Sequence, residues 1–542
     1  MLRSRCASAS KGAIAFLIIV FATLALAQGM GTSPSLDLIT FDNLSLTDRE
    51  PIVYDMGNAR HCHISTGFGS NCSKELNRSL EPVEGRDGKA LQLTYSLDKC
   101  NNSYVEVVFT FDPPIDLSSY DHLVIDWRGN QTANSLNVGM NDTELQKIAP
   151  LYRHVTQKTW WGPLVVPFKY IGSDLNLTTV RTIFISVKND SNTTDYEDEG
   201  GVSNIAIDNL RVVNISARKV PSDFEVVKPD TNASKAAANW IASQQQPNGL
   251  IKSWKDEIYA LAHLYDQALA LIIFSQENMS ENATQLVDAL VKLQNGDGSW
   301  NKTFNYSTNK SVTDDIWIGD VAWTVYALDR YIELGGDNPL AETARDAGAK
   351  WLQGQIELSP GCLQNRPVEG AIDTWWALWA LDKTEEADNL MDCIVSSYWD
   401  EEMGRFKAGK DDWKPVTDVQ TWGAAMLTAT GEREKALRAL SYAREALSVS
   451  SSDSQVSGMG DQAGPWSVSN ECTGQYIVAG GEGSNQMLQE LISQQRDDGA
   501  MPGSPDNFKG AGIWNTQWQG VAPTAWLYFA SNKGPFEQGI AK

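Results

Sequence analysis

The feature that most constrains the fold is a repeat in the second half of the chain. An amphipathic segment, a glycine-containing loop and a more apolar segment follow one another six times; the second repeat reads "ATQLVDALVKLQNGDGSW" and then "GDVAWTVYALDRYIEL". Apolar residues recur at helical spacing in both segments, so each repeat predicts a pair of helices. The loop glycines, about fifty residues apart, are Gly249, Gly298, Gly361, Gly404 and Gly499.

A single helical pair does not bury its apolar face, so the six pairs are expected to pack against one another. They predict an all-α ring, an (α/α)6 toroid, over residues 236–535. The second helix of each pair is the more apolar and fits an inner layer, whereas the first carries more charge and fits an outer layer. An open solenoid is the alternative arrangement.

The part of the chain before these repeats has a different period. Between residues 36 and 216, short β-rich runs such as "ALQLTYSL" and "YVEVVFTF" are separated by polar turn clusters. This pattern predicts an all-β antiparallel sandwich. The polar, proline-containing stretch 217–235 is expected to link the sandwich to the toroid, so the chain is expected to be multidomain.

The N-terminus has the features of an export signal. Basic residues precede an apolar run from Ala13 to Ala25, and the sequence "ALA" that ends at Ala27 has the small-x-small pattern of a cleavage site. We expect a signal peptide at residues 1–27 and no stable membrane span after its cleavage. An uncleaved anchor is the alternative.

The distribution of asparagine also indicates export. Sixteen Asn-x-Ser/Thr sequons lie between Asn43 and Asn309, which predicts an N-glycosylated protein that is secreted or held at the cell surface. The formal net charge of −24 argues against nucleic acid as a partner, because nucleic acid binds basic surfaces. In an oxidising compartment, Cys62 and Cys72 are candidates for a loop disulfide.

Acidic residues gather where the inner helices of the toroid are expected to begin. All these helix N-termini share one end of the ring, so the acids are expected to converge there. Capping and the helix dipole are the structural alternative for each of them. The candidate catalytic residues are Glu369, Asp418, Glu471, Asp266, Asp320 and Asp373.

Two of these acids are assigned roles. Glu369 lies one turn before Asp373 and between apolar residues, so burial is expected to raise its pKa and suit it to donate a proton. Asp418 opens the next inner helix and is the candidate base.

Tryptophans occur close to these acids in the sequence. An acidic cleft lined with aromatic rings suits a sugar chain, because rings stack on the apolar faces of sugars and carboxylates transfer protons. For Trp160 and Trp161 the alternative is packing in the core. The candidate substrate-binding residues are Trp254, Trp317, Trp375, Trp376, Trp422, Trp466 and Trp518 in the toroid, and Trp160 and Trp161 in the sandwich.

Three stretches of the predicted sandwich resemble a jelly-roll carbohydrate-binding module: "LITFDNL", "IDLSSYDHLVIDWRG" and "NIAIDNLRVV". The resemblance implies a concave face with aromatic side chains that binds glycan. It also implies a structural calcium ion, for which Asp42 and Asp208 are the candidates. Hydrogen bonds within turns are the alternative role for these two carboxylates.

The helical repeats resemble two groups of enzymes. "QNGDGSW" is similar to the repeat of terpenoid cyclases, in which Gln and Trp tie a helix to its neighbour, but the acidic DxDD motif of cyclases is missing. A toroid joined to a carbohydrate-binding-like module resembles the toroidal glycoside hydrolases and polysaccharide lyases. This resemblance implies a polysaccharide or oligosaccharide as partner and no cofactor for catalysis.

The expected function is therefore hydrolysis of a neutral glycan by paired carboxylates. A non-catalytic glycan-binding protein of the cell envelope is the alternative, and a polysaccharide lyase is the third hypothesis. The lyase ranks below the hydrolase for two reasons. His263 is the only histidine of the toroid that could serve as the base of a lyase, and the acidic chain would repel a polyuronate. The sequence specifies neither the sugar nor the oligomeric state.

Overall fold

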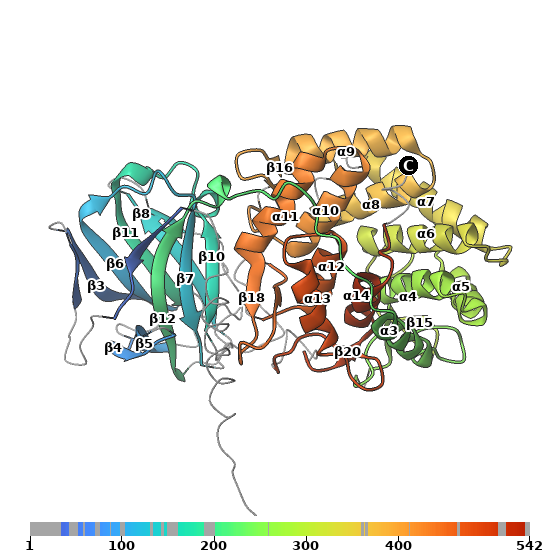
Figure 1. Ribbon diagram of the computed structural model, residues 1–542, viewed down its shortest axis with the longest axis horizontal. Coiled ribbons are helices and arrows are strands. Elements are labelled where there is room, and N and C mark those ends of the chain that lie inside the picture. Colours follow the sequence, from blue (N-terminus) through green and yellow to red (C-terminus); the bar gives the residue numbers. More distant parts are fainter. Residues whose placement is uncertain are drawn as a thin grey trace, which may run out of the picture.

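The computed structural model shows a β-sandwich followed by a ring of helices (Figure 1). The predicted signal peptide lies outside the residues that the structure describes. Among the described residues, none of the helices is long and apolar enough to cross a membrane. The described residues are 34–42, 52–57, 60–70, 76–86, 88–97, 103–130, 134–142, 146–148, 161–188, 201–257, 259–358, 362–363, 367–410, 412–462, 467–507 and 516–536.

The sandwich consists of two antiparallel six-stranded sheets, which confirms the predicted all-β part. One sheet has the order β10-β7-β12-β5-β4 with β1 paired to β12, and the other has the order β2-β3-β6-β11-β8-β9. The strands are β1 (Ser35–Ile39), β2 (Ile52–Gly57), β3 (Arg60–Gly69), β4 (Arg78–Glu84), β5 (Lys89–Leu97), β6 (Tyr104–Ile115), β7 (His122–Arg128), β8 (Ser135–Asn141), β9 (Gln146–Ile148), β10 (Gly162–Pro167), β11 (Val180–Lys188) and β12 (Gly201–Val213).

The alternation of apolar residues explains how the two sheets form one core. In β6, Val105, Val107, Phe109 and Phe111 are buried, whereas the residues between them are partly exposed. Successive side chains of a strand point to opposite faces, so every second residue of β6 enters the space between the sheets. The same alternation occurs in β5.

The prediction of a disulfide between Cys62 and Cys72 is wrong. Cys62 lies in β3 opposite Phe111, is fully buried and carries a free thiol. The inward-facing position in the strand holds its sulfur in the sandwich core. Burial raises the pKa of this thiol to about 12, so it stays protonated.

The helical part contains six outer and six inner helices among the described residues. The outer helices are α3 (Thr231–Ser243), α5 (Ser280–Leu293), α7 (Ala341–Leu358), α9 (Thr384–Tyr398), α11 (Arg433–Leu447) and α13 (Ser484–Ile492). The inner helices are α4 (Leu264–Gln276), α6 (Ile318–Glu333), α8 (Val368–Ala380), α10 (Thr417–Ala429), α12 (Asn470–Val478) and α14 (Val521–Ser531). Helix α3 begins within the predicted linker because the Asp230 carboxylate accepts hydrogen bonds from the N–H groups of Asn232 and Ala233, both at 3.0 Å.

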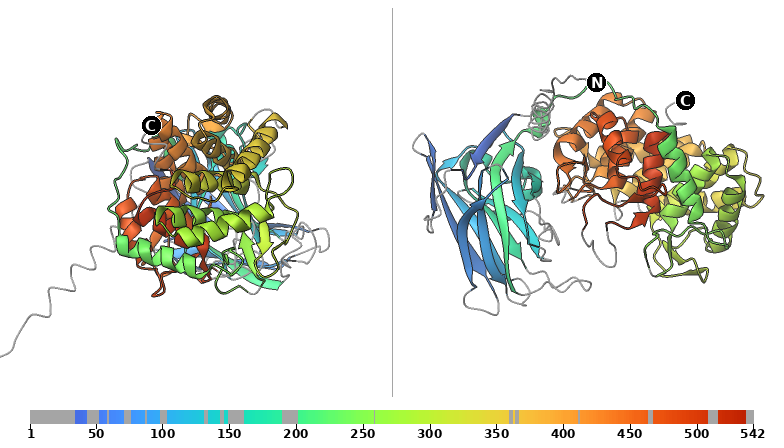
Figure 2. Two further views of the ribbon diagram at one scale, coloured as in Figure 1. Left: turned by 90° about the vertical axis from the view of Figure 1, so that its right-hand side faces the viewer. Right: turned by 60° about the horizontal axis from the view of Figure 1, so that its bottom comes forward.

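Contacts between the inner helices close the ring and confirm the predicted toroid. Each inner helix contacts the next in the order α4, α6, α8, α10, α12 and α14, and α14 contacts α4. The last inner helix also contacts the first outer helix, α3, which joins the two ends of the repeat. Figure 2 shows the helices from two further directions. The open solenoid is therefore excluded.

Short hairpins occupy several of the loops that lead from an outer to an inner helix. They bring polypeptide to the end of the ring where the inner helices begin. Their strands are β13 (Leu261–His263), β14 (Thr303–Asn305), β15 (Lys310–Ser311), β16 (Trp399–Asp400), β17 (Arg405–Phe406), β18 (Ser448–Ser450), β19 (Ser457–Met459), β20 (Met501–Pro502) and β21 (Gln519–Gly520).

A glutamine and a glycine four residues later connect neighbouring repeats. The amide of Gln294 donates hydrogen bonds to the carbonyls of Gly298 at 2.9 Å and of Ala344 in the next outer helix at 2.8 Å. Gly298 has φ +95°, and a Cβ there would lie 2.3 Å from the Ala347 carbonyl oxygen, so only glycine fits. Gln245 and Gln495 make the corresponding pairs of bonds in their own repeats.

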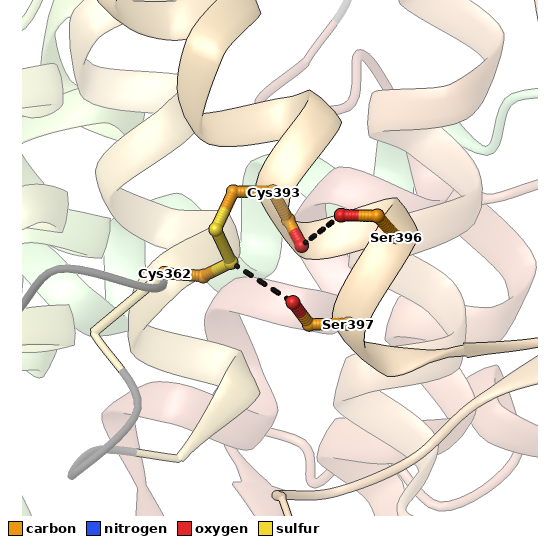
Figure 3. The surroundings of a disulfide bond; sticks show 4 residues. All are labelled: Cys362, Cys393, Ser396 and Ser397. Atoms are coloured by element: carbon orange, nitrogen blue, oxygen red, sulfur yellow. Dashed lines mark hydrogen bonds between the residues drawn. A yellow bond between two sulfur atoms is a disulfide. The ribbon is translucent and has the colours of Figure 1, made fainter.

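A disulfide joins Cys362, in the loop before α8, to Cys393 in α9 (Figure 3). The Cys362 sulfur lies 3.5 Å from the Ser397 hydroxyl, and the Ser396 hydroxyl donates to the Cys393 carbonyl at 3.1 Å. The bond therefore fixes the entrance to an inner helix on the outer helix that follows it.

The sandwich and the toroid are held together by hydrogen bonds and by apolar contacts. Arg218, which follows the last strand, is buried and donates hydrogen bonds to the Met403 carbonyl at 3.0 Å and the Gly404 carbonyl at 3.2 Å. Val124 and Val165 of the sandwich belong to the same hydrophobic core as the toroid. The two parts are therefore packed together as well as joined by a linker.

Candidate active site

A cavity of about 580 Å³ opens where the inner helices of the toroid begin. Its walls are formed by the first two turns of these helices and by the loops that precede them. The lining residues are Trp254, His263, Tyr265, Asp266, Lys302, Trp317, Asp320, Trp323, Glu369, Asp373, Asp418, Trp422, Asp461, Ser467, Val468, Ser469, Glu471, Cys472, Gln475, Gly503, Ser504, Ala522 and Pro523.

All six acids predicted from the sequence line this cavity. Five of them lie in the first turn of an inner helix, where the positive end of the helix dipole favours a carboxylate. Asp373 lies one turn deeper in α8. Because the six acids come from five different inner helices, closure of the ring is what brings them together.

The six acids differ in how far they reach the open space. Asp320, Glu369, Asp418 and Glu471 are partly exposed, whereas Asp266 and Asp373 retain only 5% and 3% of their accessible surface. The four partly exposed carboxyl groups are therefore the ones positioned to contact a substrate directly. The two buried groups lie behind them.

Burial and mutual repulsion raise the pKa of every one of these carboxyl groups. Desolvation raises the pKa of Asp266 to about 8, with hydrogen bonds from Ser253 and the Ala522 backbone acting in the opposite direction. Desolvation likewise raises the pKa of Asp320 and of Glu471 to about 7. Some of these carboxyls therefore hold protons at neutral pH, unlike carboxyls in water.

Glu369, Asp373 and Asp418 form the most strongly interacting set. Desolvation is the largest cause that raises the pKa of each, and the neighbouring carboxylates add to it. Asp418 also accepts a hydrogen bond of 2.6 Å from the Val419 N–H, which favours its ionised form. Ionisation of one member disfavours ionisation of the next, so protonated and ionised carboxyls coexist in the set.

Tyr265 and Lys302 interact with acids of the cavity and lower the pKa values of those acids. The Tyr265 hydroxyl accepts a hydrogen bond from the indole N–H of Trp526 at 2.7 Å, and its hydrogen bond to Glu471 lowers the pKa of that carboxyl against the effect of burial. The Lys302 ammonium lies 3.1 Å from the centre of the Trp317 ring. Its charge lowers the pKa of Asp320 and Glu369.

The structure separates the predicted tryptophans into three groups. Trp254, Trp317 and Trp422 line the cavity. Trp375 and Trp376 do not, because they lie in the third turn of α8, below the cavity, and pack in the core. Trp376 stacks on Phe536 with ring centres 4.4 Å apart, so neither tryptophan is placed to contact a substrate in the cavity.

Of the remaining predicted tryptophans, Trp518 and Trp161 are described by the structure and do not line the cavity. Trp518 is partly buried and is not among the lining residues. Trp161 lies in the sandwich, with the Arg128 guanidinium 5.0 Å from its ring centre. Trp160 and Trp466 are outside the residues that the structure describes.

Several lining residues were missed from the sequence. Trp323 and Gln475 lie one turn into inner helices, at the position that Asp373 occupies in α8, and this equivalence between repeats could have identified them. His263 lies in β13, and Lys302 directly precedes β14. The helical pattern of the sequence does not predict the path of these short strands. Their position depends on how the loops fold over the ring.

The two predicted calcium ligands in the sandwich serve as hydrogen-bond acceptors for backbone groups. Asp208 accepts from the N–H of Arg86 at 2.9 Å and of Asn209 at 2.8 Å, and Asp42 accepts from the N–H of Lys89 at 3.3 Å. Among the described residues, no group of three or more His, Cys, Asp or Glu side chains is arranged to hold a metal ion. The calcium site stays a prediction.

No model of a known protein family matches the chain, and no curated protein matches it. The solved structures that it resembles include a family 11 carbohydrate-binding module from Clostridium thermocellum in complex with a β-1,3-1,4-mixed-linked tetrasaccharide. That match has 12% identity and a TM-score of 0.23, and it covers 34% of this chain and 97% of the module.

Two further solved structures match the helical part or most of the chain. Cellobiose 2-epimerase from Bacillus thermoamylovorans B4167 matches with 13% identity and a TM-score of 0.41, over 55% of this chain and 98% of the epimerase. A β-1,2-glucanase from Parabacteroides distasonis matches with 9% identity and a TM-score of 0.37, over 89% of this chain and 96% of the glucanase. The sandwich and the closed ring are defined by the pairing of the strands and the contacts of the helices described above.

Proposed function

We propose that the protein is a glycoside hydrolase whose active site is the acidic cavity of the toroid. The observation that carries the proposal is the convergence of seven carboxyl groups and four tryptophans from several repeats on a single cavity. The cavity volume lies within the range usual for small-ligand sites. Exposed rings at its mouth would stack on sugar rings, and the acids would transfer protons.

Glu369 is the proposed general acid. Its carboxyl is partly exposed in the cavity, and desolvation together with Asp320 and Glu471 raises its pKa above the range usual for glutamate. A carboxyl that keeps its proton near neutral pH can donate it to the glycosidic oxygen as the bond between that oxygen and the anomeric carbon breaks. The leaving sugar thereby departs as a neutral alcohol.

Asp418 is the proposed general base. In its ionised form it accepts the Val419 N–H, and it would take a proton from a water molecule whose oxygen attacks the anomeric carbon. The proton lost by Glu369 and the proton gained by Asp418 balance, and water supplies the new hydroxyl group. Glu471 interacts electrostatically with both residues and is the alternative base.

The place of action that we propose is outside the cell. The support is the export-like N-terminus together with the sixteen sequons. Asn278 and Asn309 are exposed and have backbone φ of 55° and 56°, so their side chains lie at surface turns that a glycan could occupy. Expression in a secretory eukaryotic host followed by glycosidase treatment tests this, because an unchanged mass would contradict it.

The hydrolase proposal is tested by the release of reducing ends from a panel of oligosaccharides. Glu369→Gln and Asp418→Asn should each lower kcat at least about a hundredfold, the contribution usual for an acid or base. Glu385→Gln and Asp388→Asn alter exposed acids of the outer helix α9 and are the matched controls.

Other outcomes distinguish the competing functions. Full activity in both Glu369→Gln and Asp418→Asn would disprove the assignment of roles. Binding without release of reducing ends from any glycan would favour the non-catalytic binding protein. An unsaturated product that absorbs ultraviolet light would identify a lyase.

A further inference from the structure

Carboxyl groups outnumber basic groups in the lining of the cavity. Seven carboxyl groups face it, from Asp266, Asp320, Glu369, Asp373, Asp418, Asp461 and Glu471. Among the described lining residues, Lys302 is the only lysine or arginine. His263 adds no positive charge at neutral pH, because burial lowers its pKa to about 4. The cavity therefore lacks most of the positive charge that ionised carboxylates would need.

Two buried side chains of the lining have hydrogen-bond acceptors that no donor satisfies. Neither carboxyl oxygen of Asp373, which is 3% exposed, has a hydrogen-bond partner among the described residues. The Trp323 side chain is close enough to lower the pKa of Asp373, but the indole N–H makes no hydrogen bond of normal geometry. The amide oxygen of Gln475, also 3% exposed, has no partner in the described part of the chain.

Buried polar atoms without partners are rare because each is destabilising. Gln475 donates its amide N–H to Glu471 at 3.4 Å, so its oxygen is left to accept from another group. Asp373 and Gln475 line the same cavity, as do Trp323 and Trp422, whose indole N–H groups also lack partners among the described residues. Together they indicate a ligand that brings hydrogen-bond donors to Asp373 and Gln475 and acceptors to the tryptophans.

The aromatic residues of the cavity favour the same kind of ligand. Trp254, Trp317, Trp323 and Trp422 belong to the lining. Tryptophan faces attract cations as well as the apolar faces of sugars. Lys302 already occupies the Trp317 face in this way at the mouth. The combination of buried acceptors and tryptophan rings is suited to an ammonium group carried on a sugar.

We propose that the substrate of this cavity is an amino sugar glycan, with a protonated primary amine that lies against Asp373 and a hydroxyl group that donates to Gln475. The proposal rests on the proposed hydrolase function for its site but adds the charge of the substrate. An ammonium group supplies three donors and one positive charge, which suits two buried carboxyl oxygens without partners among the described residues. A neutral sugar supplies hydroxyl donors and no positive charge.

The proposal has a consequence for protons. Desolvation and the neighbouring carboxylates keep the pKa of Asp373 and Glu369 high. A bound ammonium group favours the ionised forms of nearby carboxyls, so binding of an amine should release protons into the buffer. Binding of a neutral sugar provides no such charge and should release none.

The test uses titration calorimetry of the full-length protein at about pH 7, where most amines of this kind are protonated. The probes are D-glucosamine, D-glucose and N-acetyl-D-glucosamine, which differ in charge and are independent of glycosidic linkage. We expect D-glucosamine to bind at least about tenfold more tightly than both neutral sugars, a difference equivalent to about 1.4 kcal/mol. Its binding heat should also change with the ionisation enthalpy of the buffer.

Variants locate the bound amine. Asp373→Asn should reduce the preference for D-glucosamine over D-glucose, Gln475→Leu should weaken the binding of both sugars, and Asp388→Asn on the outer helix α9 should change neither. Circular dichroism establishes that each variant is folded, and the buffer dependence of the binding heat of the unmodified protein keeps the test available if Asp373→Asn does not fold. A preference that folded Asp373→Asn retains would overturn the assigned position.

Equal affinity for the charged and neutral sugars would overturn the proposal, and so would calcium binding at micromolar concentration with no amine binding. These results are separate from those that test hydrolysis. Selective D-glucosamine binding without cleavage of any glycan would contradict the hydrolase and retain the amine site. Cleavage of neutral glycans alone would contradict the amine site and retain the hydrolase.

Discussion

His122 of β7 and Tyr442 of α11 share a hydrogen bond of 2.9 Å between the imidazole Nε2 and the phenol oxygen. Both residues are fully buried, and the other ring nitrogen of His122 contacts the Asp121 carboxylate at 2.6 Å. The bond joins the sandwich to the toroid across 320 positions of sequence. Burial lowers the pKa of His122, which favours the neutral ring in this interface.

Tyr442→Phe should destabilise the protein by about 1–3 kcal/mol, because it leaves a buried imidazole nitrogen without its partner. Denaturant unfolding followed by tryptophan fluorescence measures the change. Tyr259→Phe removes the hydroxyl of a tyrosine that is 50% exposed and is the matched control. Equal stability of the two variants would show that the hydrogen bond does not contribute to docking.

The proposed acid role of Glu369 predicts the alkaline side of the pH–rate profile. Activity should fall as pH rises through the elevated pKa of this carboxyl, because the proton that it donates is lost. Asp320 is the neighbouring charge that most raises this pKa, so Asp320→Asn should move the alkaline fall to lower pH. The profile of kcat/KM measures the shift, and an unchanged position would contradict the assignment. Glu385→Gln should leave the profile unchanged.

The raised pKa values also predict how stability depends on pH. Asp266 has a pKa of about 8 in the folded protein and about 3.9 when unfolded. Between these values the folded state binds more protons than the unfolded state, so the free energy of unfolding should decrease as pH rises from about 4 to 8. Asp266→Asn should reduce the slope in chemical denaturation measured across this range. A slope that stays the same would show that Asp266 is not the group that titrates.

The bond between Cys362 and Cys393 closes a loop of 31 residues. Replacing both cysteines with serine should lower the free energy of unfolding by about 2–4 kcal/mol, chiefly because the unfolded chain gains freedom. Denaturant unfolding with and without reductant checks this. Reductant should destabilise the unmodified protein more than the double variant, whereas an equal response of both proteins would contradict the prediction.

Trp317 is 53% exposed at the mouth of the cavity, where Lys302 contacts its ring. Trp317→Ala should raise KM for a hydrolysed glycan about threefold to tenfold, which corresponds to the loss of one aromatic contact. Trp518→Ala is the control, since Trp518 is not among the lining residues. A larger effect at Trp518 would place the substrate outside the cavity that we propose.

The sequence predicted the ring correctly because two local signals recurred along the repeats. The apolar residues of α6, such as Val321, Val325 and Leu328, recur at helical spacing and are buried. Glycines such as Gly298 adopt a positive φ that marks the turn between helices. With six such units, the convergence of Glu369 and Asp418 on one end of the ring follows from the order of the helices.

The sequence did not distinguish residues that share one face of a helix but differ in depth. Trp376 and Trp422 both follow an acidic residue on an inner helix, yet only Trp422 lies in the first two turns and reaches the cavity. Cys62 likewise lies in a strand, and its burial in the sandwich core became evident only from the packed structure.

The sequence alone therefore determined the periods of the two parts, the number of helical pairs and the acidic character of the inner helix N-termini. These properties depend on residues close together in the chain. The tertiary structure decided the contact between His122 and Tyr442, the entry of Lys302 into the cavity and the raised pKa values of the acids. Those properties arise from desolvation and charge between segments that meet only when the ring closes.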